Sequence, residues 1–181
     1  MSVYVSLLRG INVGAQKMIR MEALRGIYQG LGFAQVITYL QSGNVVFESP
    51  ATDPSRLAKR IEGGIEQALG YSVPVFIRQP KQLEQILANN PFLVEGMKDT
   101  KMLHVSFLYR PAGDTAWSKL VFPEGIPDKF ARGDSVIYLY YPNGYAKARI
   151  SNAFLEKALG VPLTNRNWNT VNALYRMAIE I

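Results

Sequence analysis

Basic side chains gather in two stretches of this sequence, and a group of like charges can bind an anion. The chain has 181 residues and a net charge of +6. Residues 9–25 carry a net charge of +3 and residues 147–176 carry +4, which leaves −1 for the rest of the chain. Like charges that lie close together repel one another, and a bound anion relieves the repulsion. The two basic stretches are therefore the first places to expect a phosphate-bearing ligand.

The first stretch opens with a glycine-containing segment, Arg9-Gly10-Ile11-Asn12-Val13-Gly14-Ala15-Gln16-Lys17. It follows a predicted strand and precedes a predicted helix, where backbone N–H groups and a helix N-terminus can hold an anion. It is neither a Walker A loop nor a dinucleotide-binding turn, because its glycines have the wrong spacing and no Gly-Lys-Ser/Thr follows. We predict an anion site that uses Arg9, Asn12 and Lys17. The alternative is a mobile surface loop whose charges are solvated.

The second stretch contains Asn165-Arg166-Asn167-Trp168-Asn169-Thr170 just before a predicted helix. These residues offer hydrogen-bond donors, acceptors and an aromatic face for stacking. We predict that Arg166, Asn167, Asn169 and Thr170 contact the same anion, in a groove between two halves of the chain. The alternative is structural, since asparagine is a common N-cap and a tryptophan is a common packing residue.

Residues that the chain lacks exclude several chemistries. Without cysteine there is no disulfide, no thiolate metal site and no cysteine nucleophile. His104 is the one histidine, so a His-rich metal site is excluded, and its place in an alternating strand favours a structural or exposed role. Ser42 has no other histidine to activate it, and Ser42-Gly43-Asn44 suits the tip of a tight hairpin. We predict neither a metal nor a cofactor.

The elements that position these residues follow a simple order in the first half of the chain. Alternating apolar residues predict strands, helical spacing of apolar residues predicts helices, and Asp53-Pro54 is typical of a helix start. The resulting order is strand, helix, strand, strand, helix, strand. The predicted ranges are 3–8, about 24–31, 36–41, 44–48, 54–69 and 73–78.

The second half repeats short pieces of the first in the same order. Val5-Ser6-Leu7-Leu8 matches Val105-Ser106-Phe107-Leu108, and Ala68-Leu69-Gly70 matches Ala158-Leu159-Gly160. We predict an α+β protein formed by tandem duplication of a ferredoxin-like βαββαβ unit, with antiparallel sheets, helices on one face and an extra C-terminal helix. The predicted parts are a first unit (1–79), a helical linker (80–101), a second unit (102–164) and a C-terminal helix (165–181).

Two local expectations follow from this fold. Gly70 and Gly160 each end an apolar-striped helix, so both are expected to adopt a positive φ. Within one copy, the Ser42-Gly43-Asn44 hairpin and the Arg9 loop are expected to leave opposite ends of the sheet, and so not to share a site.

Three blocks of the sequence resemble a known family. They are Leu7-Leu8-Arg9-Gly10-Ile11-Asn12-Val13-Gly14, Thr38-Tyr39-Leu40-Gln41-Ser42-Gly43-Asn44-Val45-Val46-Phe47 and Arg166-Asn167-Trp168-Asn169-Thr170. The chain is similar over essentially its whole length to the bacterial domain-of-unknown-function 1697 family. The resemblance implies tandem ferredoxin-like units and brings no activity, ligand or catalytic residue.

The function expected from the sequence is a binding module for a phosphate-bearing ligand, either a nucleotide or a nucleic acid. The strand aromatics of RRM domains are missing, so RNA recognition of that type is not expected. One alternative is an enzyme that acts on a small acidic metabolite, and another is a structural or protein-interaction unit. No apolar run is long enough for a membrane span, and no secretion signal is recognisable, so we expect no membrane contact and a cytoplasmic location.

Overall fold

The computed structural model describes residues 1–97 and 99–181. The chain divides into two compact units. Unit 1 comprises Met1–Glu84 and Ala173–Ile181, and unit 2 comprises Gln85–Asn172. The linker and the C-terminal helix that we expected from the sequence are therefore each shared between the two units.

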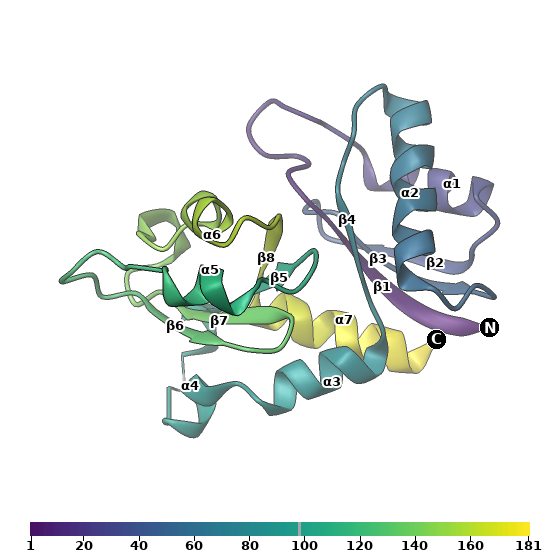
Figure 1. Ribbon diagram of the computed structural model, residues 1–181. Helices are drawn as coiled ribbons and strands as arrows, with labels where there is room; N and C mark the ends of the chain where they lie inside the picture. Colours follow the sequence, from purple (N-terminus) through teal and green to yellow (C-terminus); the bar gives the residue numbers. More distant parts are fainter. Residues whose placement is uncertain (98) are drawn as a thin grey trace. The chain divides into compact units, whose positions relative to one another are not determined.

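Unit 1 contains a four-stranded antiparallel sheet with the strand order β2-β3-β1-β4. Two helices, α1 and α2, alternate with the strands along the chain and lie on one face of the sheet (Figure 1). The first part of α3 and the end of α7 also belong to this unit. The elements are β1 (Ser2–Leu8), α1 (Met21–Gly30), β2 (Ala34–Tyr39), β3 (Asn44–Ser49), α2 (Pro54–Leu69), β4 (Val75–Arg78), α3 (Pro80–Ala88) and α7 (Trp168–Glu180).

Helix α2 begins and ends as its sequence predicts. The Asp53 side chain accepts hydrogen bonds from the N–H groups of Ser55 and Arg56, which caps the helix start. The helix ends at Gly70, whose φ of 75° lies in the left-handed region that suits glycine. Gly160 ends α6 in the same way with a φ of 65°. The predicted positive φ of both glycines is confirmed.

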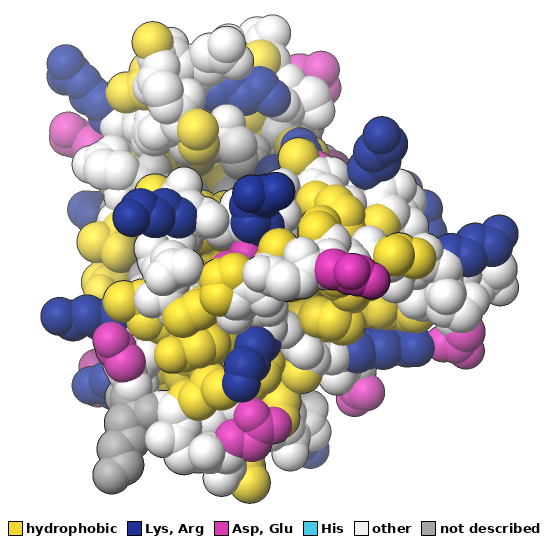
Figure 2. Space-filling model, turned by 90° about the vertical axis from the view of Figure 1, so that its left-hand side faces the viewer, with side chains coloured by type: hydrophobic (Ala, Val, Ile, Leu, Met, Phe, Trp, Pro, Cys, Tyr) yellow, Lys and Arg dark blue, Asp and Glu magenta, His cyan; other side chains and the backbone are white. Residues whose placement is uncertain are grey.

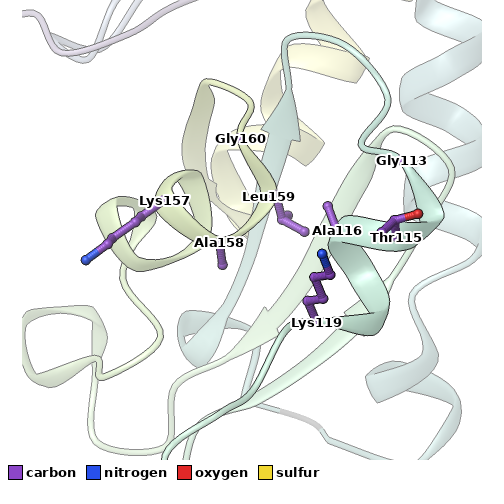
Figure 3. Close-up of a pocket in the computed structure, with 8 residues that line it drawn as sticks. All are labelled: Gly113, Thr115, Ala116, Lys119, Lys157, Ala158, Leu159 and Gly160. Carbon is purple, nitrogen blue, oxygen red and sulfur yellow. The ribbon is translucent and has the colours of Figure 1, made fainter.

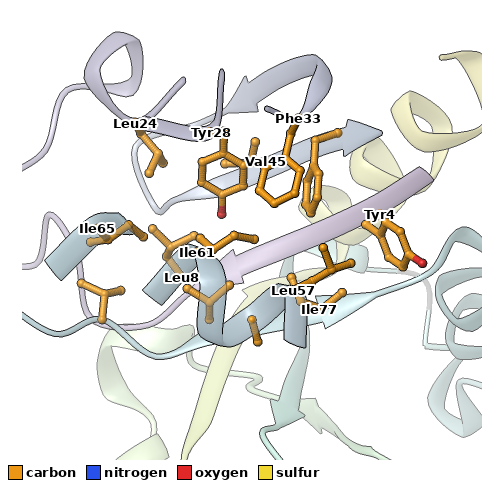
Figure 4. Close-up of a cluster of buried hydrophobic side chains, with 14 of the residues drawn as sticks. Tyr4, Leu8, Leu24, Tyr28, Phe33, Val45, Leu57, Ile61, Ile65 and Ile77 are labelled. Atoms are coloured by element: carbon orange, nitrogen blue, oxygen red, sulfur yellow. The ribbon is translucent and has the colours of Figure 1, made fainter. Parts of the chain in front are cut away.

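The core of unit 1 is apolar and rich in aromatic rings. Leu57, Ile61 and Ile65 of α2 lie on one helix face and pack with side chains of the sheet (Figure 4). Phe47 on β3 is fully buried, and its ring centroid lies 4.7 Å from that of Phe33. These apolar contacts fill the space between the helices and the sheet.

Unit 2 has a sheet with the same pattern, in the order β6-β7-β5-β8, again antiparallel. Strands β1 and β5 thus hold equivalent places in their sheets. The short α5 and β6 were predicted only through the repeat of the first unit, without residue ranges. The elements are α4 (Pro91–Val94), η1 (Thr100–Met102), β5 (Leu103–Leu108), α5 (Asp114–Ser118), β6 (Lys129–Arg132), β7 (Val136–Tyr140), η2 (Tyr145–Lys147), α6 (Asn152–Leu159) and β8 (Leu163–Asn167).

The helices of unit 2 are half as long as those of unit 1. Helix α5 has 5 residues against 10 in α1, and α6 has 8 against 16 in α2. The irregular segment before α6 supplies part of the missing cover. It is held by the buried Asp128 carboxylate, which accepts hydrogen bonds from the N–H groups of Arg149 and Ile150 at 2.6 and 3.0 Å. Unit 2 therefore uses buried polar groups where unit 1 uses helix length.

Candidate functional site

The loop between β1 and α1, residues 9–20, is folded around the side chain of Asn12. Both amide hydrogens of Asn12 are donated, to the carbonyl oxygens of Ile19 at 3.0 Å and Gln41 at 2.7 Å. Its side-chain oxygen accepts the N–H of Ile19 at 2.8 Å. Asn12 itself adopts a φ of 53°, a conformation that asparagine tolerates better than most residues. Because its donors are used within unit 1, Asn12 shapes the loop instead of reaching out to a ligand.

The loop and the β2–β3 hairpin lie at the same end of the sheet. The N–H of Leu8 donates to the Gly43 carbonyl at 2.8 Å, and a Cβ atom on Gly43 would lie only 2.5 Å from Cδ1 of Ile11. Our expectation that the hairpin and the Arg9 loop leave opposite ends was wrong. Since β1 and β3 are antiparallel, the end of β1 lies beside the start of β3, where the hairpin is.

Two of the three basic residues of this loop, Arg9 and Lys17, are joined to one short segment, residues 72–74, which leads into β4. The ammonium group of Lys17 donates to the Ser72 carbonyl at 2.9 Å and lies 5.9 Å from the centroid of the Tyr71 ring. The backbone N–H of Arg9 donates to the Pro74 carbonyl at 3.0 Å. The loop is thus held on both sides, with Lys17 exposed and Arg9 half-buried.

Helix α1 begins immediately after this loop. Its N-cap residue is Arg20, which makes no side-chain cap hydrogen bond. The first N–H groups of a helix have no partner within the helix and form the positive end of its dipole. The loop end of unit 1, defined here as residues 9–20, 40–43 and 70–74, therefore combines basic side chains with the start of a helix.

The residues predicted in the second basic stretch have local partners in unit 2. Arg166 is only 6% exposed and donates to the Thr164 hydroxyl and the Asn165 carbonyl at 2.8 and 2.7 Å. Burial lowers the pKa of its guanidinium to about 10, and the interaction with Tyr145 acts in the opposite direction. These contacts give Arg166 a structural role in its own strand.

The asparagines beside it serve the start of α7. The Asn167 side chain accepts the N–H of Asn169 at 2.8 Å, which is the geometry of an N-cap. Thr170 and Trp168 are buried, and Asn169 is exposed. Arg9, Asn12 and Lys17 lie in unit 1, and Arg166, Asn167 and Asn169 lie in unit 2. That the two stretches share one ligand stays a prediction.

Sequence reasoning missed a second buried arginine, Arg78 on β4. It pairs with Val5 of β1 as Arg166 pairs with Val105 of β5, so the two arginines hold equivalent places. Each also donates to the carbonyl oxygen of the residue before it, at 2.8 Å in Arg78 and 2.7 Å in Arg166. Burial lowers the pKa of Arg78 to about 10 as well. Arg78 in β4 and Arg166 in β8 stand at equivalent positions of the two repeated units. This equivalence could have identified the pair.

A chain of polar side chains in unit 2, which we call the polar chain, was also missed. His104 Nδ1 lies 2.7 Å from Oδ1 of Asn165, whose Nδ2 donates to the Ser106 hydroxyl at 3.0 Å. Ser106 in turn donates to Oδ1 of Asn152 at 3.1 Å. The alternation in Leu103–Leu108 places His104 and Ser106 on one side of β5, but only the fold brings the two asparagines to them.

Each unit has a shallow hollow between its two helices. The hollow in unit 2 has a volume of about 490 Å³ and lies between α5 and α6, with Lys119 and Lys157 at its rim (Figure 3). The Lys157 side chain points away from the hollow in this view. The hollow in unit 1, between α1 and α2, has a volume of about 320 Å³, and its lining carries no charged side chain. Neither hollow converges on a set of polar groups.

The surface and the metal chemistry of the described residues complete the survey. On the face seen in Figure 2, hydrophobic side chains lie in groups, and Lys and Arg side chains stand singly among them. Within residues 1–97 and 99–181, no group of histidine and acidic side chains could hold a metal ion. In the same part of the chain, no helix is both long and apolar enough to cross a membrane.

These observations define an α+β protein with two four-stranded antiparallel sheets, each with helices beside it. The family of proteins of unknown function DUF1697 matches residues 1–138, and the chain belongs to that family. Its fold is similar to that of the conserved bacterial protein SP0830 from Streptococcus pneumoniae, with a TM-score of 0.76, 23% identity and 98% of each chain covered. A comparison with curated proteins finds no match.

Proposed function

We propose that the protein is a binding module for a phosphate-bearing ligand, and that the loop end of unit 1 holds the phosphate. The observation that carries the proposal is the attachment of Arg9 and Lys17 to residues 72–74 while Asn12 fixes the loop between them. These hydrogen bonds fix the loop that carries Arg9 and Lys17 before any ligand arrives, which lowers the entropic cost of binding. The positive charge of the loop favours a phosphate.

The start of α1 supports the same proposal. The N-cap Arg20 leaves the helix start without a side-chain cap, and uncapped N–H groups favour an anion. In this proposal Arg9 and Lys17 supply charge, and Asn12 shapes the loop. Arg166, Asn167, Asn169 and Thr170 as further contacts remain predictions from the sequence.

We propose in addition that each unit is ferredoxin-like and that the two arose by duplication. Both sheets place their first strand third in the spatial order, and both units alternate their elements as β-α-β-β-α-β. The equivalent Arg78 and Arg166 support a common origin, as do the two glycines with positive φ that end α2 and α6. A cytoplasmic location is proposed from the lack of cysteine.

Thermal unfolding with added inorganic phosphate tests the anion site. A ligand that binds the folded state at a hundred times its Kd stabilises the fold by about 2.7 kcal/mol. We expect phosphate to raise Tm, and we expect Arg9→Ala and Lys17→Ala to lose most of that rise. Lys59→Ala removes an exposed charge from α2 of the same unit and is the matched control. It should keep the response to phosphate.

Further ligands separate the enzyme from the nucleic-acid module. A rise in Tm with one acidic metabolite alone, matched by turnover of that compound, favours the enzyme. Binding of an oligonucleotide that weakens steeply with salt favours a nucleic-acid module. A phosphate response that is equal in wild type, Arg9→Ala and Lys17→Ala contradicts the proposed site.

A further inference from the structure

His104 occupies a place in unit 2 that belongs to an apolar core position in unit 1. By strand register, Tyr4 faces Phe47 in unit 1 as His104 faces Leu139 in unit 2. Tyr4 is fully buried and its hydroxyl donates to the Ala51 carbonyl at 3.0 Å. The equivalent residue His104 instead makes a hydrogen bond within the polar chain. Filling the core would not by itself require such a bond. A polar replacement at a core position requires either structural compensation or a function.

The polar chain fixes which nitrogen of His104 carries the proton. Asn152 Oδ1 accepts from Ser106, so the Ser106 oxygen is left to accept from Nδ2 of Asn165. The Asn165 oxygen then faces His104 at 2.7 Å and can only accept, so Nδ1 is protonated. In a neutral imidazole the other nitrogen, Nε2, then holds a lone pair.

The neutral form of His104 is favoured near pH 7. Burial lowers the pKa of its imidazole because it disfavours the charged form, and the hydrogen bond to Asn165 opposes this only in part. Among the residues that the structure describes, none makes a hydrogen bond to Nε2. The ring is only 7% exposed, and its Nε2 is an acceptor that the described part of the unit does not use.

Two tyrosines hold this ring in place. Tyr141 meets it edge-on at a centroid distance of 5.2 Å, and its own hydroxyl is fixed by donation to the Ile150 carbonyl at 2.8 Å. Tyr145 stacks on the ring at 5.0 Å with an angle of 17° between the planes, and Tyr145 is 45% exposed. The imidazole thus lies beneath an aromatic side chain at the surface. Burial, and to a lesser extent Asp128, raises the pKa of the Tyr141 hydroxyl, and Arg166 opposes the rise that burial causes in the pKa of Tyr145.

We propose that His104 Nε2 is the hydrogen-bond acceptor of a second ligand site, which lies wholly in unit 2 and takes a sugar hydroxyl. A phosphate anion is better matched by a charged donor than by a neutral acceptor, and the described residues around His104 do not supply the further ligands that a metal ion needs. A hydroxyl group donates to an imidazole nitrogen, and the exposed Tyr145 ring offers the face on which a sugar or a nucleoside packs. The site does not depend on the loop end of unit 1.

The single histidine makes the tautomer measurable without assignment, because every imidazole signal in an ¹⁵N NMR spectrum is from His104. We expect the Nδ1-protonated tautomer at pH 7 in the wild-type protein. D-Ribose and adenosine at millimolar concentration are the probes. A shift of the Nε2 signal with both indicates recognition of the sugar alone, and a shift with adenosine only indicates a nucleoside. A protonated Nε2, or no shift with either probe, overturns the proposal.

Variants of His104 test whether binding needs its acceptor nitrogen or only its aromatic ring. His104→Phe keeps an aromatic ring and removes the acceptor, so it should weaken binding by about tenfold, the effect of one lost hydrogen bond. His104→Gln retains an acceptor oxygen and should recover part of the affinity. Wild-type affinity should also fall as the pH is lowered, because protonation of Nε2 removes the lone pair. Affinity that is equal in His104→Phe and wild type contradicts the assignment.

Discussion

The two units differ in how they satisfy the hydrogen bonds of a buried polar side chain at the centre of the sheet. A serine lies at the centre of each sheet, Ser6 in β1 and Ser106 in β5, and both are fully buried. Ser6 bonds to the Tyr28 hydroxyl of α1 at 2.7 Å, within a core that is otherwise apolar. Ser106 bonds to two asparagines that are only half-buried. Long helices let unit 1 enclose its polar group, whereas the short helices of unit 2 leave a polar chain that extends toward solvent.

The largest expected effect comes from the ring cluster of unit 1. Phe47→Ala removes a fully buried ring that contacts Tyr4, Tyr28 and Phe33, so it should lower the free energy of unfolding by about 3–5 kcal/mol. Leu139→Ala, at the equivalent place in unit 2, should cost about 2–5 kcal/mol and less than Phe47→Ala, since it breaks no ring contact. Denaturant titration measures both values. A larger loss for Leu139→Ala would reverse the comparison.

A smaller effect distinguishes the two central serines. Ser6→Ala strands the buried Tyr28 hydroxyl, so it should cost about 1–3 kcal/mol. Ser106→Ala frees two amides that water can reach, and should cost about 0.5–1.5 kcal/mol. The double variant Ser6→Ala/Tyr28→Phe is the control, because removing both partners should restore part of the loss. Equal costs for the two serines would show that Ser106 is as enclosed as Ser6.

The smallest effect should be the same in both units. Gly70→Ala and Gly160→Ala each place a Cβ atom on a residue with positive φ and open surroundings, at a cost of about 1 kcal/mol. Gly63→Ala is the matched control within α2, where no atom is close and φ is not positive, and it should stabilise the helix by about 0.5–1 kcal/mol. Unchanged denaturation midpoints in both C-cap variants would contradict the comparison.

The sequence predicted those parts of the fold that local patterns determine. Helix 54–69 has sixteen residues with an apolar stripe, is flanked directly by its cap Asp53 and by Gly70, and was predicted to the residue. The ranges of helix α5 and strand β6 were not predicted because each is too short to show a period, at 5 and 4 residues. The hairpin lies beside the Arg9 loop because β1 pairs antiparallel with β3. The expectation of opposite ends did not take this pairing into account.

The candidate sites divide in the same way. Charge counting identified the loop of Arg9 and Lys17, because charge is visible in the sequence. It could not predict that the Asn12 side chain would donate its hydrogen bonds to backbone carbonyls, or that Arg166 would be buried. The polar chain joins residues up to 61 positions apart, so its hydrogen bonds exist only in the folded unit. Sequence reasoning saw His104 and Ser106 on one strand and had no means of adding Asn152 and Asn165.

The contact between Gly43 and Ile11 has an evolutionary consequence. A Cβ atom at position 43 would meet Ile11 Cδ1 at 2.5 Å and Leu8 Cβ at 2.9 Å, and Gly43 has a φ of 75°. Any larger residue at position 43 therefore has to be accompanied by a smaller one at position 11 and by a different hairpin. The two positions are 32 apart in sequence, yet a change at one requires a change at the other. They should therefore covary among the relatives of this protein.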